Sequence, residues 1–351
     1  MFIMKQFVYV SHPSRVVFGA GAAAQLGAEV AGLGAKRVLL ISSRARSEAV
    51  KSIARGLPVV DVFDRAVMHT PHDVVEAARM MAKAANADCC VAVGGGSTIG
   101  FGKAIALTSG LPVVAVPTTY SGSEMTTIWG ISEGKMKRTG RDPKVLPRVV
   151  IYDPQLTLGL PAAVSAASGM NAIAHCVEAL YAHDGNPIVS LMAEEGIRAL
   201  AKALPVIIGD GQNLDARGDA LYGSWLAGST IATTSVALHH KLCHVLGGLG
   251  LPHAETHAIV LPHAMRYNYG AALRAMKRVE VAIGAENAPA AMWDLEAGLG
   301  IPMKLSEIGM KRVDLERAAR TAVEAPYPNP RKVEFAAVME LLQNAYEGKK
   351  P

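Results

Sequence analysis

Short apolar segments alternate with helical segments through the first 158 residues of the chain. The segments 15–18, 37–42, 59–63, 89–93 and 113–116 are rich in Val, Ile, Leu and Cys, the composition of strands that are buried on both faces. The residues between them, such as 73–86 and 98–107, read as helices. Because strand and helix alternate, the sequence predicts a parallel, doubly wound sheet of the Rossmann-like kind.

The pattern changes between Asp153 and Pro161, where strand-like segments give way to long helical ones. We expect helices over 162–182, 188–204, 216–247 and 261–269, and in several segments up to residue 346. A chain of 351 residues is long enough to build two hydrophobic cores. We therefore predict an α/β domain over residues 1–158 and an all-α domain over residues 159–351.

Composition and charge exclude several classes of protein. Half of the residues are apolar and 19% are charged, which is typical of a well-packed globular protein. The net charge of +5 is not gathered into a dense basic stripe, so we expect no nucleic-acid partner. No run of 18 apolar residues is free of charge and glycine, and we see no signal peptide. With four cysteines and no CxxC pair, we expect a cytoplasmic protein that does not enter a membrane.

A glycine turn follows the apolar segment 89–93 and opens a helix. Glycines let a phosphate approach the backbone, and the helix N-terminus offers free N–H groups. A second polar loop, PTTYSGSE at 117–124, follows the next strand, at the sheet edge where doubly wound folds bind nucleotides. The alternative is a tight turn without a ligand. We expect a dinucleotide here, bound by Gly94, Gly95, Gly96, Ser97, Thr118, Thr119 and Ser123.

The segment after the strand 37–41 bears on the choice of cofactor. A site that selects NAD usually has an acidic residue near this position, which binds the ribose hydroxyls. This chain has Ser42 and Arg44 instead, in the run Ser-Ser-Arg-Ala-Arg. We therefore expect that NADH and NADPH are both accepted.

Six of the eleven histidines lie between residues 239 and 263. His240 and His244 are four residues apart and share one face of a helix. Glycines end that helix, and Leu251-Pro252 returns the chain to deliver His253. Upstream, Asn171 and His175 have the same four-residue spacing. We predict that these segments meet at the active site, while His239, His257 and His263 support it.

These motifs, in this order, resemble those of the iron-containing alcohol dehydrogenase superfamily. They are GGGS at 94–97, PTTYSGSE at 117–124, GMNAIAH at 169–175, HKLCHVLG at 240–247 and PHAETHAIVLPH at 252–263. The resemblance covers nearly the whole chain and implies the dehydroquinate-synthase-like fold of that superfamily. The longer stretches HHKLCHVLGG, LPHAETHAIVLPHA and VPTTYSGSEMTTIWG are similar to its maleylacetate reductase branch.

The resemblance also implies a metal position. Members that hold a divalent metal bind it through an aspartate and three histidines, and the matching residues here are Asn171, His175, His240 and His253. A neutral amide oxygen is a much poorer ligand for iron or zinc than a carboxylate. Three imidazoles can hold a metal by themselves, but the lost charge lowers affinity. We therefore expect no required metal.

The maleylacetate reductase branch implies NAD(P)H-dependent reduction of a dianion, maleylacetate, to 3-oxoadipate in the breakdown of aromatic compounds. Hydride addition to the carbon–carbon double bond places negative charge on the ketone oxygen, and imidazoles can stabilise it and supply a proton. We expect His244 and His240 to do this, with His175 and His253 completing the pocket. Lys241 is a further catalytic candidate, and it or Arg266 can pair a substrate carboxylate. The expected substrate contacts are Asn171, Tyr120, Ser121 and Arg266.

Three alternatives stay open at this stage. One is a metal-dependent alcohol dehydrogenase of the same superfamily, which Asn171 argues against. A second is a lyase of the dehydroquinate-synthase type, for which the helical domain lacks the extra lysines and acids that a phosphorylated sugar would need. A third is a non-catalytic nucleotide-binding protein, against which the clustered histidines argue. A homodimer is the expected assembly, because homodimers are the commonest oligomers.

Overall fold

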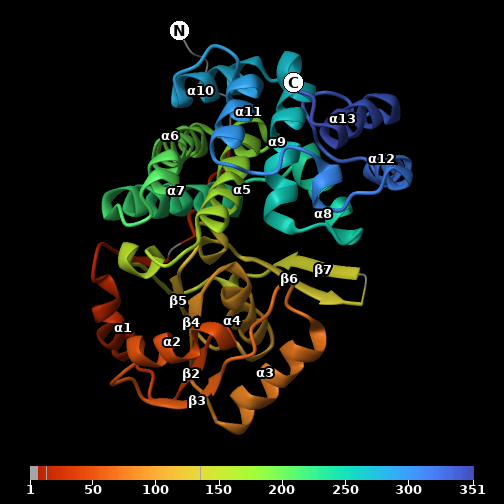
Figure 1. Cartoon of the computed structure of the whole chain (residues 1–351). Helices are drawn as coiled ribbons and strands as arrows, with labels where there is room; N and C mark the ends of the chain where they lie inside the picture. Colours follow the sequence, from red (N-terminus) through yellow and green to blue (C-terminus); the bar gives the residue numbers. More distant parts are fainter. Residues whose placement is uncertain (1–6, 13, 135) are drawn as a thin grey trace. The chain divides into compact units, whose positions relative to one another are not determined.

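The computed structural model describes residues 7–12, 14–134 and 136–351, which divide into two compact units (Figure 1). The first unit contains His12–Leu160 together with Gln212–Leu221. The second contains Pro161–Gly211, Tyr222–Pro351 and the described N-terminal residues up to Ser11. The predicted arrangement, a parallel α/β part followed by a helical part, is confirmed.

The first unit is built on a parallel sheet whose strands follow the order β1-β8-β5-β4-β2-β3. Its strands are β1 (Arg15–Phe18), β2 (Val38–Ile41), β3 (Val59–Phe63), β4 (Cys89–Gly94), β5 (Val113–Pro117) and β8 (Val149–Tyr152). Along the chain, β3 is added on one side of β2, and the next strand, β4, is added on the other side. The direction of strand addition therefore reverses at β2. This reversal is a topological switch point, the place where open α/β sheets bind ligands.

Helices cover both faces of this sheet, as the period of two along each strand requires. The helices are α1 (Leu26–Gly32), α2 (Ser47–Ile53), α3 (His72–Ala84) and α4 (Gly96–Ser109). Val38, Leu40 and Val91 share a core with residues of α1 and α2. The alternate positions Ile41 and Ala92 face α4, where Gly102 lets the helix approach the strands closely.

An antiparallel hairpin follows the sheet strand β5 and was not predicted. It pairs β6 (Ile128–Glu133) with β7 (Met136–Arg141). Its residues mix charged, polar and glycine positions and lack the apolar run that marks a buried strand, so periodicity did not reveal it.

The second unit consists of helices. They are α5 (Ala162–Tyr181), α6 (Pro187–Gly209), the later part of α7 (Leu214–Thr233), α8 (Leu238–Gly248), α9 (His253–Asn268), α10 (Leu273–Ile283), α11 (Ala288–Gly298), α12 (Leu315–Val323) and α13 (Phe335–Glu347). A core of buried apolar side chains joins α8, α9, α12 and α13. Within the described chain, no helix has the length and the apolar run needed to cross a bilayer.

One predicted helix is broken in the structure. The segment 216–247 was expected to form a single helix, but α7 ends at Thr233 and α8 begins at Leu238. The run Thr-Thr-Ser at 233–235 explains the break, since hydroxyl side chains compete for backbone partners. The backbone N–H of Ser235 donates to the Asp184 carboxylate, which holds the interruption in place.

Candidate functional site

The predicted cofactor residues of the first unit gather at one edge of the sheet. Strands β5, β4 and β2 are neighbours, and their carboxyl ends lead into Thr118, Gly95 and Ser42. Gly96 is the first residue of α4, and no side chain caps this helix N-terminus. The free N–H groups of α4 are therefore available to a phosphate.

The glycine turn and the 118–126 loop (residues 118–126, after β5) fit each other closely. The backbone N–H of Thr118 donates to the carbonyl of Gly94 at 3.0 Å. A Cβ atom on Gly95 would lie 3.0 Å from Thr119 Cγ2, and one on Gly96 would lie 3.0 Å from Ser121 Oγ. Larger residues would push the loop away, which explains why glycine occupies these positions.

Two buried hydroxyls on this edge have no hydrogen-bond partner among the described residues. They are Ser42 Oγ, after β2, and Thr118 Oγ1, after β5. Buried polar groups are rarely left unpaired, so both are candidates for contacts to a bound ligand. Arg44 is exposed two residues after Ser42, and Ser97 and Ser123 are partly exposed.

Tyr120 has a different place from the one expected. Its side chain is fully buried, and its hydroxyl accepts a hydrogen bond from the Arg217 guanidinium at 2.9 Å. Arg217 is itself buried and also donates to the carbonyl of Leu160. The structure therefore makes Tyr120 part of the core of the first unit, and a direct contact with substrate is not supported. Ser121, one residue later, is partly exposed.

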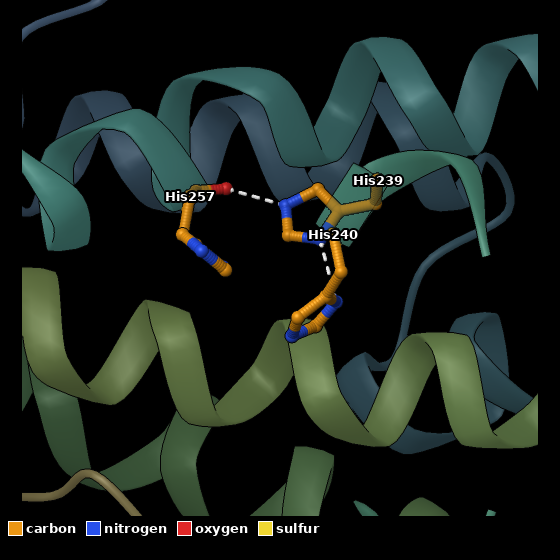
Figure 2. A group of neighbouring side chains, drawn as sticks. All are labelled: His239, His240 and His257. Carbon is orange, nitrogen blue, oxygen red and sulfur yellow. Dashed lines mark hydrogen bonds between the residues drawn. The ribbon is translucent and has the colours of Figure 1, made fainter. Parts of the chain in front are cut away.

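In the second unit, six histidines form a continuous group around His240. The His240 ring lies 5.1 Å from the ring of His175, 5.0 Å from His239, 6.4 Å from His244 and 4.8 Å from His257, between ring centroids. The His257 ring in turn lies 4.2 Å from that of His253. Helices α5, α8 and α9 supply these side chains, three of which Figure 2 draws. Sequence reasoning placed His239 and His257 in support, whereas the structure puts both against His240.

Glu178 orients His240. The buried Glu178 carboxylate accepts the backbone N–H groups of Ala237 and His239, both at 2.9 Å, and the Nδ1–H of His240 at 2.7 Å. His239 Nε2–H donates to the carbonyl of His257 at 2.8 Å, as Figure 2 shows. His240 Nδ1 therefore carries the proton in the neutral ring, and Nε2 keeps its lone pair.

The sequence pattern did not show that Glu178 holds His240. The helix break at 234–237 leaves the first N–H groups of α8 without intrahelical partners, and Glu178, which belongs to α5, caps them. A carboxylate three residues after His175, on the same helix face, was the available signal.

Burial keeps the inner histidines neutral. It lowers the pKa of His240, His175 and His257 well below the ordinary 6.5, and neighbouring imidazoles lower each further. Burial also lowers the pKa of His239 to about 4, although the Glu178 carboxylate opposes this shift. By contrast, His244 and His253 are exposed. The group thus combines a neutral interior with two imidazoles that face solvent.

Several buried polar atoms of this group have no hydrogen-bond partner among the described residues. They are Asn171 Oδ1, His175 Nδ1, His240 Nε2 and both ring nitrogens of His257. Asn171 lies one turn before His175 on α5, so these atoms belong to adjacent side chains. Because native interiors leave few polar groups unpaired, the concentration of unpaired atoms here indicates a binding site for a polar ligand.

The histidine group includes the metal position that the resemblance implies, and its geometry there can be described. Among the described residues, the three side chains whose possible ligand atoms all lie within 4.8 Å of one another are His239, His240 and His257, not the set with His175 and His253. His239 Nε2 is already bonded, and its Nδ1 lies 3.2 Å from His240 Nδ1. Asn171 adds no charge to these neutral donors. A set of neutral donors attracts a divalent ion less strongly than a set that includes a carboxylate.

Arg266, a cationic residue expected near the substrate, lies apart from the histidine group. Arg266 follows His253 by 13 residues on α9, which places it about 20 Å farther along the helix axis. It lines a separate surface pocket of about 500 Å³ with His263 and Arg331. The expected substrate contact of Arg266 is therefore not supported. Lys241 lies on α8, with its Nζ 5.9 Å from the centre of the Tyr327 ring.

His263 provides a test of buried-histidine energetics away from the site. Burial lowers its pKa to about 4, so between pH 6.5 and pH 4 the unfolded chain binds the proton that the folded chain excludes. The contribution of neutral His263 to the free energy of unfolding is therefore complete above pH 6.5 and is lost as the pH falls toward 4. His263→Gln should reduce the slope of unfolding free energy against pH by about 1 kcal/mol per pH unit between pH 6 and pH 5. Urea unfolding at the two pH values measures it, and equal slopes would contradict the assignment.

Comparison with known proteins identifies the family of the chain. The family model described as iron-containing alcohol dehydrogenase matches residues 13–154, and the model described as Fe-containing alcohol dehydrogenase family, C-terminal, matches residues 165–346. A maleylacetate reductase of Burkholderia cepacia is 51% identical over 351 residues, covering 99% of this chain and 100% of the relative.

Solved structures agree as well. The crystal structure of maleylacetate reductase from Agrobacterium tumefaciens is similar with a TM-score of 0.96 and 46% identity, over 99% of this chain and 100% of that one. The maleylacetate reductase of Rhizobium sp. strain MTP-10005 matches with a TM-score of 0.95 and 46% identity, over 99% and 100% of the two chains.

Proposed function

The chain belongs to the iron-containing alcohol dehydrogenase family, and on that premise we propose that it acts as a maleylacetate reductase. It transfers hydride from a nicotinamide cofactor to the carbon–carbon double bond of maleylacetate and yields 3-oxoadipate. The relatives that match at about half identity over the full length carry this activity in their names.

The observation that carries the proposal is the set of unpaired polar atoms around His240. A dianionic substrate needs hydrogen-bond donors. An unpaired ring nitrogen becomes a donor when it is protonated, and the Asn171 side chain carries an NH₂ group beside its unpaired Oδ1, so this group can supply such donors. Neutral groups are also easier to bury than unpaired cations. The exposed His244 and His253 lie next to this group and are the first imidazoles that a ligand from solvent meets.

The chemistry follows from the tautomer of His240. Hydride adds to the alkene carbon β to the ketone, and the electron pair of the double bond moves toward the ketone oxygen as an enolate. The arriving dianion favours protonation of the unpaired His240 Nε2, and Glu178 stabilises the resulting imidazolium through Nδ1. The Nε2–H then donates to the enolate oxygen, and as the ketone re-forms this proton passes from Nε2 to the carbon next to the ketone, which returns His240 to its neutral form. One hydride and one proton complete the reduction.

The cofactor lies, in this proposal, at the carboxyl edge of β5, β4 and β2. The N-terminus of α4 binds the phosphates, while Ser42 Oγ and Arg44 contact the adenosine ribose. Since no acidic residue follows β2 directly, the KM for NADPH should stay within about a hundredfold of that for NADH, which corresponds to roughly 2.7 kcal/mol. Initial rates with each cofactor decide this, and a larger gap would contradict the role given to Arg44.

The experiment that tests the function also tests the metal. The purified chain, exhaustively treated with a chelator, should oxidise NADH in the presence of maleylacetate at an undiminished rate, because the donor set lacks a carboxylate. Loss of the activity on chelation, restored by Fe²⁺ or Zn²⁺, would favour the metal-dependent alcohol dehydrogenase. No oxidation with any metal would favour a non-catalytic nucleotide-binding protein. A homodimeric state and a cytoplasmic location stay predictions.

A further inference from the structure

Lys103 is a buried cation that the chemistry above does not use. It lies on α4, seven residues after the first residue of that helix, and its side chain is 1% exposed. Its Nζ donates to the carbonyl of Ser123 at 2.8 Å and to Thr126 Oγ1 at 2.9 Å. Burying an ammonium is unfavourable unless it is well bonded, and burial lowers the pKa of Lys103 to about 7. Both of its bonds go to the 118–126 loop.

Glu124 anchors the same loop from another side. Its carboxylate is fully buried and accepts the hydroxyl of Tyr152, on β8, at 2.8 Å. Ser121 Oγ donates to the other carboxylate oxygen at 3.4 Å. The negative charge of Glu124 also favours the charged form of Lys103. Two buried ionisable groups therefore tie the loop to α4 and to β8.

The position of this loop decides the shape of the glycine turn. Ser121 and Thr119 approach the turn so closely that a single added methyl group would collide with them. A shift of the loop by a few tenths of an ångström would therefore open or close the space over Gly95 and Gly96. Lys103 fixes that position, because its Nζ donates a hydrogen bond to the carbonyl of Ser123, which lies within the loop.

We propose that Lys103 is a positioning residue, which holds the 118–126 loop against the glycine turn so that the two together are preorganised for the phosphates of the dinucleotide. The inference rests on the proposed function, in that this sheet edge binds NAD(P)H. Lys103 itself acts through Ser123 and Thr126.

The test is NADH binding in the absence of maleylacetate, followed by the fluorescence of NADH. Lys103→Met keeps the length and removes both hydrogen bonds, so the Kd for NADH should rise by about tenfold or more, while kcat at saturating NADH changes less than about threefold. Thr126→Val removes one of the two acceptors of Lys103, together with the local bonds of the hydroxyl to Ser123 and Ile128, and should raise the Kd by about threefold. The double variant should bind no worse than Lys103→Met, because both substitutions break the same contact. Lys83→Met, an exposed lysine on α3, is the matched control and should leave the Kd unchanged.

Thermal unfolding separates positioning from mere support of the fold. A Lys103→Met chain that melts earlier but binds NADH with the wild-type Kd would overturn the proposal. If Lys103→Met does not fold, Thr126→Val decides, and an unchanged Kd there would overturn it equally. A wild-type chain that binds neither NADH nor NADPH would contradict the proposed function, and with it this role. Normal wild-type binding with unaffected variants would contradict only the role of Lys103.

Discussion

Replacement of His240 by alanine is expected to lower kcat for maleylacetate reduction by about a hundredfold or more, the usual scale for losing a general acid or a charge stabiliser. His240 is the ring that contacts four other histidines, and its Nε2 is unpaired while Glu178 holds its Nδ1. The neighbouring His239 is turned away, since its Nε2–H donates to the His257 carbonyl. Steady-state rates at saturating NADH measure the effect.

Two companion variants sharpen this result. His72→Ala removes a partly exposed histidine on α3, outside the group, and should leave kcat unchanged. His244→Ala, which was expected from the sequence to be as damaging as His240→Ala, now tests whether an exposed member of the group contributes equally. NADH affinity should stay the same in all three. A folded His240→Ala chain with a kcat within threefold of wild type would place the chemistry on another residue.

The substitution Glu178→Gln should reduce both stability and activity. The carboxylate receives three N–H donors and offers only acceptors, whereas the amide turns an NH₂ group toward one or more of them. Breaking a buried charged contact typically costs about 3–5 kcal/mol, so the free energy of unfolding should fall by at least about 2 kcal/mol. kcat should fall as well, because His240 loses the group that fixes its tautomer. Urea unfolding and steady-state rates report the two effects.

The control for Glu178→Gln is Glu316→Gln on α12. Glu316 makes an exposed ion pair with Arg320, and such pairs are worth about 1 kcal/mol or less. Both variants remove one negative charge, so the difference between them isolates burial and the cap on α8. Equal stability changes would show that Glu178 neither caps α8 nor holds His240.

Local pattern was sufficient for much of the fold. The strands at 38–41, 89–94 and 113–117 are apolar on both faces, and each leads to a polar turn, so their parallel pairing followed from composition alone. The hairpin at 128–141 and the break between α7 and α8 were missed, since neither has a distinctive apolar period. In the second case the break depends on Asp184 and Glu178, which are distant in sequence.

The residue types of the candidate site were readable in the sequence, because imidazoles at helical spacing and glycines after a strand are local features with few structural uses. Which of these residues lie together at the site, and which lie elsewhere, was decided by tertiary structure. Only the tertiary structure shows that Tyr120 is hydrogen-bonded to Arg217 inside the core and that Arg266 lies along α9 away from His253. It alone shows that Lys103 donates a hydrogen bond to the loop 20 residues later. A hydrogen bond or a desolvated charge depends on which distant groups the fold brings together. The periodicity of apolar residues along the sequence does not contain that information.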